Sequence, residues 1–553
     1  MVFVKQLADI MLKKIFAPFC RAGFRLNTIF VKEIAMKAVN TSQMQRLDRE
    51  AIEDYGIAGL ILMENAGTGV FEAIQRHYPS ELKKGTLIVA GPGNNGGDGF
   101  VVARKLHQKG YPLEVWILSS REKFKGDALV NLKIIEKLDL TIRYILDEDV
   151  ASATKELNRF GLIIDAIFGT GLKRPVEGRF KAIINAINEA QIATASVDIP
   201  SGLSSDTGLP LGTAVKADLT ITMALPKIGH ILSPGAFYTG ELEIVDIGIP
   251  VKAIKDADIK GELLDKDTIK GLMKERPPWG HKGTFGHAVI VAGSRGKTGA
   301  AALAAHGALR AGSGLVTVAS PKCAQDTISK IIPPEVMTLW LSDAAQTGEV
   351  SEKARDELIE FLEKKKSVVL GPGIGLSLAS KELQKWLITE CRLPMVIDAD
   401  ALTTLSEDLS ILKEKKAPRV LTPHPGEMAR LMGCSTSEVQ ENRLHMATSL
   451  SKDTDSIVVL KGARTIIAEP SGRFSVNPTG NSGMGQGGMG DALSGIIGGL
   501  LAQGYTPYDA ARIGVYVHGL CADILKKVKG PFGFTATELC EILPTVWKQL
   551  VGC

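Results

Sequence analysis

The chain has 553 residues, of which 45% are hydrophobic, so it is long enough for two or more domains that each bury a core. Its 65 basic and 61 acidic side chains leave a net charge of +4, which is small for this length and gives no electrostatic basis for binding nucleic acid or an anionic membrane. No apolar run approaches the roughly 18 residues that a membrane span needs, so we expect small-molecule partners, no nucleic acid and no membrane.

The N-terminal extension and the cysteines bear on localisation. Residues 1–35 are basic and rich in phenylalanine, but they lack the apolar core and the small-residue cleavage site of a secretory signal. We expect Met36 to be the true start and residues 1–35 to be an untranslated extension, with a targeting or surface helix as the alternative. The seven cysteines are scattered and form no CxxC pair, which is typical of reduced thiols and predicts a cytoplasmic protein.

From about residue 41 to residue 251, apolar segments alternate with helical ones. A helix is predicted over residues 99–109, and strands over residues 86–90, 113–118, 162–166, 194–198 and 246–250. These strands are continuously apolar rather than alternating, which is typical of a parallel sheet that is covered on both faces. The pattern predicts a doubly wound α/β domain over residues 36–255.

The first motif of this domain is GPGNNGGDG, which follows the predicted strand 86–90 and opens a helix. It satisfies GxGxxG, but that signal alone is weak, and the acid that a dinucleotide fold places at the end of the second strand is here Glu114, inside that strand. We interpret the motif as a polar binding segment; the alternative is a tight turn in which asparagine adopts left-handed positions. Its candidate residues are Asn94, Asn95, Gly96, Gly97 and Asp98.

Two further strands end in an aspartate. Asp165 ends the strand LIID and Asp198 ends the strand TASVD, and each precedes a loop that contains glycine. Because the carboxyl ends of parallel strands share one edge of a sheet, we expect these oxygens to gather in one pocket suited to a cation or a sugar. Any one of them could be a helix cap, but three strand ends together favour a binding site.

The segments NNGGDG, DAIFGTGLKRP and VDIPSG resemble the epimerase domain of the NAD(P)H-hydrate repair system, over about residues 40–251. The resemblance implies that residues 94–98 and Asp198 contact the substrate, and our own candidate for an acid–base catalyst in this pocket is Asp165. It also implies a K⁺ site formed by Asn95, Asp165 and Ser201. The second substrate loop that it implies comprises Gly169, Thr170, Gly171, Leu172, Lys173, Arg174 and Pro175.

A second α/β series follows a predicted linker. Residues 256–280 are rich in charge and end in two prolines, which predicts the linker, and residues 281–553 then form a second domain. Its strands are predicted over residues 287–292, 315–319, 367–370, 395–397, 419–421 and 456–460. The segment GSRGKT lacks the first glycine of a P-loop, because Val291 occupies that position, so we interpret it as a strand-to-helix turn.

Three turns of the second domain carry candidate site residues. GPGIG contains Gly373 and is almost free of side chains, and TPHPGE presents His424, which could otherwise be an ordinary polar loop residue. The turn KGART is basic and suits a nucleotide phosphate or base.

The most informative segment of the second domain is the glycine-rich stretch that ends in Asp491. Six glycines lie among residues 480–490, and an apolar helix begins at once, so free amides and a helix N-terminus can hold a phosphate. A carboxylate beside an anion site suggests a base that takes a proton from a hydroxyl that meets phosphate. The alternative, a flexible linker, fits poorly because a buried helix follows directly.

The segments HKGTFGHAVIVAGS, GPGIG, TPHPGEMARL, KGART and TGNSGMGQGGMGDALSGIIGGLLAQG resemble the ribokinase-like family, and more narrowly the ADP- or ATP-dependent NAD(P)H-hydrate dehydratases, over residues 266–547. Where that family usually has GNPGMATGGTGD, this chain differs, Met489 among the differences. The resemblance implies that Asp491 is the catalytic base, that Gly373, His424 and Asp491 contact the substrate, and that Mg²⁺ accompanies the nucleotide. The nucleotide contacts that it implies are Lys461, Gly462, Ala463, Arg464, Thr465, Gly487, Gly488, Met489 and Gly490.

Together the resemblances imply a Rossmann-like three-layer domain followed by a ribokinase-like α/β domain. The expected function is a bifunctional repair enzyme that epimerises the R and S hydrates of NADH and NADPH and dehydrates the S form at the expense of ADP or ATP; we also expect a homo-oligomer. Two alternatives stay open on the residues alone. One is a hydroxymethylpyrimidine or sugar kinase fused to a regulator, and the other is a first domain that binds without catalysing.

Overall fold

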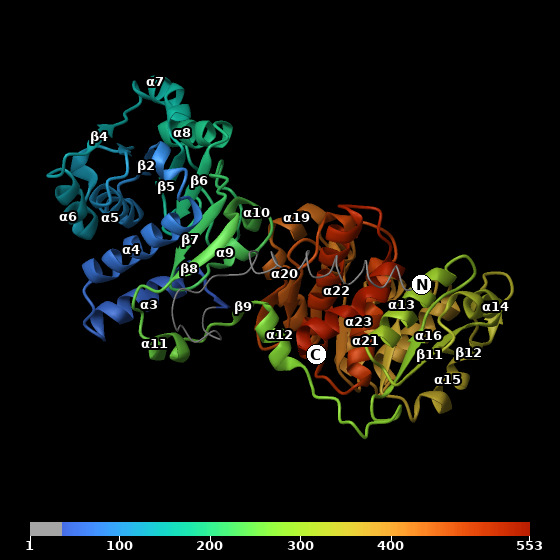
Figure 1. The fold of residues 1–553 in the computed structure, drawn as a ribbon. Coiled ribbons are helices and arrows are strands. Elements are labelled where there is room, and N and C mark those ends of the chain that lie inside the picture. Colours follow the sequence, from blue (N-terminus) through green and yellow to red (C-terminus); the bar gives the residue numbers. More distant parts are fainter. Residues whose placement is uncertain (1–35, 553) are drawn as a thin grey trace. The chain divides into compact units, whose positions relative to one another are not determined.

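The structure is a computed structural model that describes residues 36–552. It divides between Ile259 and Lys260 into two compact units, called here the first and the second unit (Figure 1). No helix within residues 36–552 is both long and apolar enough to cross a membrane.

The first unit contains a parallel sheet with the strand order β4-β3-β2-β5-β6-β7-β8. The expected strands 86–90 and 162–166 are confirmed as β2 and β5, which are buried along their whole length. The strands are β2 (Thr86–Ala90), β3 (Leu113–Ile117), β4 (Thr141–Tyr144), β5 (Leu162–Ala166), β6 (Ala193–Val197), β7 (Leu219–Met223) and β8 (Glu241–Val245), besides the short β1 (Lys37–Ala38).

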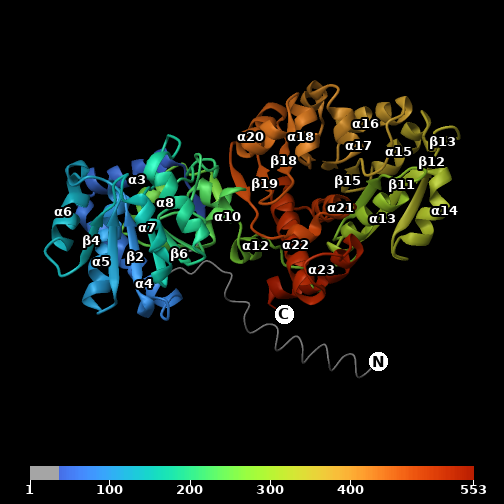
Figure 2. The same cartoon turned by 90° about the horizontal axis from the view of Figure 1, so that it is seen from above.

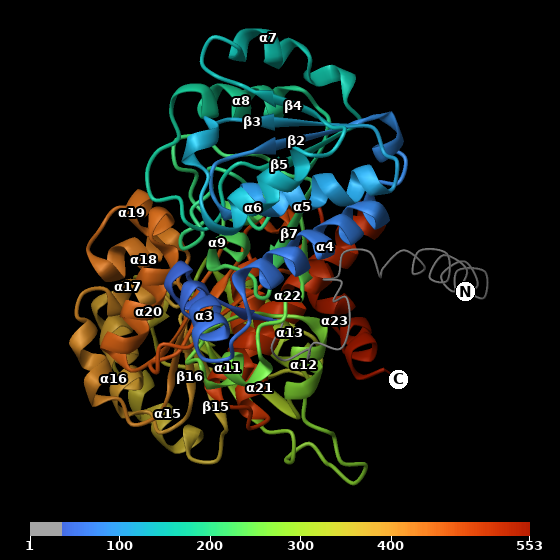
Figure 3. The ribbon, with the colours of Figure 1, turned by 90° about the vertical axis from the view of Figure 1, so that its left-hand side faces the viewer.

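Alternate residues of β2 enter different cores, so helices cover both faces of the sheet. Ile88 packs in the core beneath α3 to α6, whereas Leu87 and Val89 pack in the core beneath α7 and α8. The two helix layers lie on opposite sides of the strands (Figure 3), which confirms the three-layer Rossmann-like architecture. The helices are α3 (Thr41–Glu53), α4 (Gly59–His77), α5 (Asn94–Gln108), α6 (Gly126–Ile135), α7 (Val150–Lys155), α8 (Gly178–Glu189), α9 (Ile228–Ile231), α10 (Gly235–Thr239) and α11 (Val251–Asp256).

The last strand of this unit was placed wrongly by the sequence. It is β8 (Glu241–Val245), not residues 246–250, because Asp246 begins a turn in which its carboxylate accepts the Gly248 N–H at 2.8 Å. Strands β4 and β7 were missed, since β4 is a half-exposed edge strand and β7 alternates threonine with apolar residues.

The second unit is built on a sheet with the strand order β9-β20-β19-β18-β17-β16-β15-β10-β11-β12. The strands from β18 to β12 are parallel, and β19 and β20 are antiparallel additions. The strands are β9 (Gly261–Leu263), β10 (His287–Val291), β11 (Leu315–Pro321), β12 (Met337–Leu341), β15 (Ser367–Leu370), β16 (Met395–Ile397), β17 (Arg419–Leu421), β18 (Ile457–Leu460), β19 (Ile466–Ala468) and β20 (Phe474–Val476), besides the hairpin of β13 (Asp343–Ala344) and β14 (Glu349–Val350).

Figure 2 shows this sheet between two helix layers, with α16, α17, α18 and α20 on one side and α13, α21, α22 and α23 on the other. The second group packs in one large apolar core. The helices are α12 (Lys266–Leu272), α13 (Thr298–Arg310), α14 (Lys322–Ile331), α15 (Ala354–Leu362), α16 (Leu378–Glu390), α17 (Asp400–Leu405), α18 (Pro425–Met432), α19 (Thr436–Glu441), α20 (Arg443–Thr454), α21 (Met489–Ala502), α22 (Pro507–Lys529) and α23 (Ala536–Val551).

Helices α13 and α21 approach each other through small residues. A Cβ added at Gly495 would overlap the carbonyl oxygen of Ala304, and one at Gly307 would overlap that of Ala492. Glycine is therefore required at both positions, and the two backbones are held in direct contact.

Part of the expected linker belongs to the second unit. Strand β9 and helix α12 fall within residues 256–280, and β9 pairs with β20 in parallel. Leu264 and Ile269 are buried in the core of the unit, so this segment is packed structure rather than a free connection.

Candidate functional site

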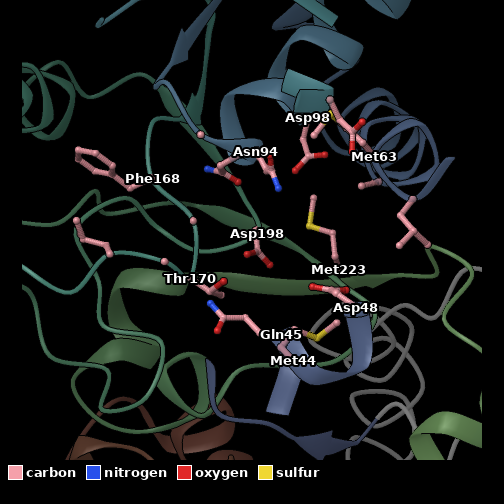
Figure 4. A pocket seen from close by; sticks show the side chains of 18 of the residues that line it. Met44, Gln45, Asp48, Met63, Asn94, Asp98, Phe168, Thr170, Asp198 and Met223 are labelled. Atoms are coloured by element: carbon pink, nitrogen blue, oxygen red, sulfur yellow. The ribbon is translucent and has the colours of Figure 1, made fainter. Parts of the chain in front are cut away.

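The first unit contains a cavity of about 780 Å³ at the carboxyl ends of its central strands, a volume typical of a small-molecule site. Helices α3, α4 and α5 and the loops after β5 to β7 line it (Figure 4). Of the residues singled out in the sequence, those that line it are Asn94, Asn95, Asp98, Gly169, Thr170, Gly171, Leu172, Lys173, Arg174 and Asp198.

The NNGGD segment forms the first turns of α5 and is not a loop. Gly96 and Gly97 do not line the cavity. A Cβ at Gly96 would overlap the carbonyl oxygen of Gly91, and one at Gly97 would meet the sulfur of Met63 at 2.7 Å. These glycines permit close packing, which brings Asn94, Asn95 and Asp98 to the cavity wall.

One wall of the cavity carries a buried ion pair between Asp198, which was singled out in the sequence, and Lys227, which was not. Lys227 is 1% exposed, and its Nζ donates to Asp198 Oδ1 at 2.6 Å, to Thr222 Oγ1 at 2.8 Å and to the Met223 carbonyl at 3.0 Å. Burial raises the pKa of Asp198, but the Lys227 ammonium outweighs burial and lowers it, so the carboxylate is ionised. A lysine inside the apolar run ALPKIGHI was the available signal for Lys227.

The carboxyl groups of Asp98 and Asp48 also face the cavity, but their pKa values are raised and not lowered. Burial raises the pKa of Asp98 well above its ordinary value, and the negative charges of Asp198 and Asp48 raise it further. Burial raises the pKa of Asp48 to about 6, with Lys227 opposing the shift. No sequence pattern distinguishes Asp48, because it lies in the charged stretch RLDRE on α3, which resembles a solvated helix face.

Asp165 was expected to be a catalytic group, but it does not line the cavity. Its side chain is fully buried outside the cavity lining. It accepts hydrogen bonds from the Ser196 hydroxyl at 2.8 Å, the Ser201 N–H at 2.8 Å and the Ile167 N–H at 3.2 Å. Asp165 therefore ties the loops after β5 and β6 together. Pro175 is also absent from the lining.

Asn95 carries two buried polar atoms without a protein partner. Its side-chain Oδ1 and Nδ2 are both enclosed and make no hydrogen bond to residues 36–552. Such groups are rare in folded proteins and call for an explanation, for example an ion or a ligand. No group of three or more His, Cys, Asp or Glu side chains suited to a metal occurs within that range.

In the second unit, Asp491 lies in the first turn of α21, and this helix begins directly after Gly488, which has a φ of 90°. Burial raises the pKa of Asp491 to about 7, and the charge of Asp398 adds to that rise while Lys461 opposes it. A carboxylate with a pKa near neutrality suits a general base.

A buried ion pair lies beside Asp491. Lys461 Nζ donates to Asp398 Oδ1 at 2.8 Å, and the Ser494 hydroxyl donates to Asp398 Oδ2 at 2.6 Å. Burial lowers the pKa of Lys461, but Asp398 and Glu427 outweigh burial and raise it, so the ammonium is charged. Sequence reasoning missed Asp398, although the doublet of acids in DAD at the end of β16 was a usable signal.

The loop that contains Gly373 packs against the turn after β10. The Ser294 hydroxyl donates to the Gly373 carbonyl at 2.8 Å, and a Cβ at Gly373, whose φ is 63°, would meet Lys297 Cβ at 2.9 Å. Lys297 Nζ in turn donates to Asp400 Oδ2 at 3.0 Å, and the Gly375 N–H donates to the same oxygen at 2.9 Å. Asp400 thus links the loops that follow β10, β15 and β16.

His424 caps α18. Its Nδ1 accepts the Gly426 N–H at 3.0 Å, while Glu427 Oε2 accepts the His424 N–H at 2.7 Å. Burial and the nearby Lys461 lower the pKa of His424, so the ring is neutral and its proton is on Nε2. The side chain is 53% exposed, and its Nε2 lies 3.5 Å from Glu427 Oε1.

The residues that were expected to contact the nucleotide offer mostly backbone groups to a ligand. Met489 is 5% exposed and packs in the core, and Gly487 has open space beside it. A Cβ at Gly490 would lie 3.3 Å from Lys461 Nζ, which places that ammonium at the start of α21. In the KGART turn, Gly462 and Arg464 adopt φ values of 134° and 57°, and the Thr465 hydroxyl donates to the Gly462 carbonyl at 2.9 Å; Ala463 is exposed there.

Comparison with known families agrees with both halves. Residues 288–545 match the family model described as NAD(P)H-hydrate dehydratase, and residues 59–229 match that of the YjeF-related protein N-terminus.

The chain is also similar to known proteins over most of its length. The bifunctional NAD(P)H-hydrate repair enzyme of Moorella thermoacetica is 42% identical over 517 residues, which cover 93% of this chain and 97% of that protein. The enzyme of the same description from Thermofilum pendens is 38% identical over 521 residues, with 93% and 97% covered. Among solved structures, the ADP/ATP-dependent NAD(P)H-hydrate dehydratase from Bacillus subtilis, co-crystallised with ATP/Mg²⁺, is 30% identical with a TM-score of 0.45 and covers 52% of this chain and 98% of that one.

Proposed function

The chain belongs to the family of bifunctional NAD(P)H-hydrate repair enzymes, and we propose how its residues divide the two reactions. The first unit epimerises the hydrates at C6 of the nicotinamide ring, and the second dehydrates the S form with ADP or ATP. The single observation that carries the second assignment is Asp491, with a pKa near 7, at a glycine-rich helix N-terminus beside the Lys461–Asp398 pair.

Dehydration needs the C6 hydroxyl to become a better leaving group. Asp491 takes the hydroxyl proton, the oxygen attacks the terminal phosphoryl group of the nucleotide, and phosphate then leaves as the ring regains its double bond. Lys461 supports this step because its charge lies at the start of α21, where the phosphoryl group passes. Gly373 and His424, whose side chain is half exposed, hold the substrate.

The nucleotide is held mainly by backbone amides. We assign its phosphates to the amides of residues 487–490, and its remaining contacts to the basic turn of residues 461–465. Mg²⁺ that enters with the nucleotide neutralises phosphate charge, and the nearby carboxylates of Asp398 and Asp400 fit its preference for oxygen.

Epimerisation needs the hydroxyl to leave C6 and to return on the other face. As it leaves, positive charge develops on C6 and N1 of the ring, and the Asp198 carboxylate, kept ionised by Lys227, is suited to stabilise that charge. Asn94, Asp98 and the loop of residues 169–174 enclose the substrate.

We further assign K⁺ to Asn95, Asp165 and Ser201. The fit rests on the buried Asn95 oxygen that lacks a protein partner and on the Asp165 carboxylate that ties the adjacent loops. When bound, K⁺ would supply a fixed positive charge that holds these loops beside the cavity.

Cytoplasmic localisation and homo-oligomeric assembly stay predictions. The first is in line with the free thiols of all five cysteines within residues 36–552.

The test follows the return of reduced nicotinamide absorbance from mixed R and S hydrates of NADH, with ADP or ATP and Mg²⁺. The wild type restores all of it, and Asp491→Asn lowers the dehydration rate by about 10²–10⁴-fold, the usual contribution of a general base. Asp453→Asn, an exposed aspartate of α20, is the matched control and leaves the rate unchanged. Recovery of the S fraction alone would refute the epimerase, and a stable phosphate ester as product would favour a kinase.

A further inference from the structure

Two carboxyl groups enter the cavity of the first unit from different helices. Asp48 lies on α3 and Asp98 on α5, and in Figure 4 they extend into the cavity on either side of Met223. Neither side chain makes a hydrogen bond or an ion pair with another residue of the part of the chain that the structure describes. They are nevertheless close enough for the charge of Asp48 to raise the pKa of Asp98.

The third carboxylate of this group has a different environment. Asp198 Oδ1 is engaged by Lys227, whose ammonium keeps it ionised. Asp198 therefore has a constant charge, whereas Asp48 and Asp98 are free to exchange a proton with a bound molecule.

We propose that Asp48 and Asp98 are the two acid–base catalysts of the epimerisation, each serving one face of the nicotinamide ring. This inference rests on the epimerase activity proposed above and assigns the groups that move its protons. An inversion through a planar intermediate needs proton transfer on both faces of C6, and a pair of unpartnered carboxyls from separate helices meets that requirement.

The proton and electron balance of the step is simple. The protonated carboxyl gives its proton to the C6 hydroxyl, the C6–O bond breaks so that water leaves with the bonding pair, and the N1 lone pair forms a C6=N1 bond. A second water then adds to the opposite face, the C6=N1 electron pair returns to N1, and the added water gives a proton to the ionised carboxylate. One water leaves and one enters, one proton passes from the first carboxyl to the second, and nothing is oxidised or reduced.

The protonation states support this exchange. Burial raises the pKa of Asp98 well above its ordinary value, whereas the pKa of Asp48 is about 6, so Asp98 holds a proton more readily than Asp48 does. Asp198 faces the same intermediate and balances the positive charge of its C6=N1 bond.

The experiment uses the full chain without ADP or ATP, so that no dehydration occurs, with the separated R and S hydrates of NADH in ¹⁸O-labelled water. Mass spectrometry measures ¹⁸O in each epimer, above the rate without enzyme. The wild type inverts either epimer and labels both. Asp48→Asn and Asp98→Asn each lower inversion by about 10²-fold or more. Each variant still exchanges the hydroxyl on the face that keeps its carboxyl, so the two variants label opposite epimers.

The matched control is Glu53→Gln, an exposed carboxylate near the end of α3, which inverts and labels as the wild type does. If Asp48 has only a structural role, Asp48→Asn should lower the labelling of both epimers together, and that result would overturn the proposal. Inversion by Asp48→Asn at the wild-type rate would also overturn it, as would labelling of the same epimer by both variants. If Asp48→Asn does not fold, Asp98→Asn still tests single-epimer exchange, and Asp48→Glu is expected to retain inversion at a reduced rate. A wild type that neither inverts nor labels would instead refute the epimerase function itself.

Discussion

Four aspartates of this chain differ in charge state although burial disfavours ionisation of each. Asp198 is ionised because the Lys227 ammonium lies 2.6 Å away, while burial and the charges of Asp198 and Asp48 raise the pKa of Asp98 well above its ordinary value. Asp48 and Asp491 lie between these extremes, with pKa values of about 6 and about 7. The neighbours of each carboxyl, rather than its residue type, decide which can act as an acid or a base near neutral pH.

The pKa of Asp491 predicts the pH dependence of dehydration. The base must be ionised, and its pKa is raised to about 7, so kcat/KM should increase with pH up to about 7 and fall about tenfold per unit below it. Lys461→Met removes the cation that lowers this pKa, so the rise should move to higher pH. The measurement is a pH–rate profile of both proteins at saturating nucleotide; a wild-type profile that is flat through neutrality would contradict the assignment.

Because the buried polar atoms of Asn95 lack a hydrogen-bond partner, we predict that K⁺ raises both the stability and the epimerisation rate of the first unit. K⁺ that binds only the folded state stabilises it by about 2.7 kcal/mol at 100 times its Kd, so the melting temperature of this unit should rise with K⁺. Epimerisation should fall when K⁺ is replaced by tetramethylammonium. Asn95→Ala should lose both responses and keep dehydration, whereas Glu53→Gln should retain both. An unchanged K⁺ response in Asn95→Ala would place the ion elsewhere.

At the scale of helices and strands, the contact between α13 and α21 fixes the dehydratase site. Helix α21 begins beside Asp491, and α13 begins directly after Lys297. Because glycines bring their backbones into contact, the two helices hold these site residues in a constant relation.

Gly495→Ala should therefore destabilise the second unit. The added Cβ would overlap the carbonyl oxygen of Ala304, a backbone atom that cannot move aside without separating the two helices. We therefore expect a loss of about 1–3 kcal/mol or more in the free energy of unfolding. Gly271→Ala is the control, since nothing lies within 4 Å of its added Cβ, and helix propensity predicts a gain of up to about 1 kcal/mol. Denaturant unfolding measures both, and equal stabilities would contradict the prediction.

The sequence predicted the central elements better than the peripheral ones. Continuous apolar runs identified β2, β5 and β15, because both faces of these strands are buried. Edge strand β12 is largely exposed and has no continuous apolar run, and the antiparallel strands β19 and β20 were not predicted either.

Part of the site was predictable from local sequence patterns. Asp198, His424 and Asp491 lie in recognisable turns or helix starts. No local pattern distinguishes Asp48 from a surface acid, and the one signal for Lys227 was its position inside an apolar run.

At the scale of the whole molecule, each unit has an apolar core of its own. The cores of the first unit draw only on residues before Lys260, and the large core of the second only on residues after it. The residues that we propose for each reaction likewise come from one unit.

Cutting the chain between Ile259 and Lys260 should leave two folded parts with one activity each. Residues 1–259 should epimerise without dehydrating, and residues 260–553 should dehydrate only the S hydrate. Absorbance recovery from mixed hydrates should be partial with the second part and complete when both are combined. Absence of epimerisation by a folded first part would show that the activity needs both units.

The backbone character of residues 487–490 has a consequence for finding related enzymes. Three of the four are glycines, and the side chain of Met489 packs in the core, so on the proposed assignment this segment would meet a nucleotide with amides alone. Another apolar residue at position 489 would keep the same amides in place. An alignment that scores side chains will therefore underrate the likeness of such loops, whereas a search on backbone angles, with the positive φ of Gly488 as its marker, would recover them.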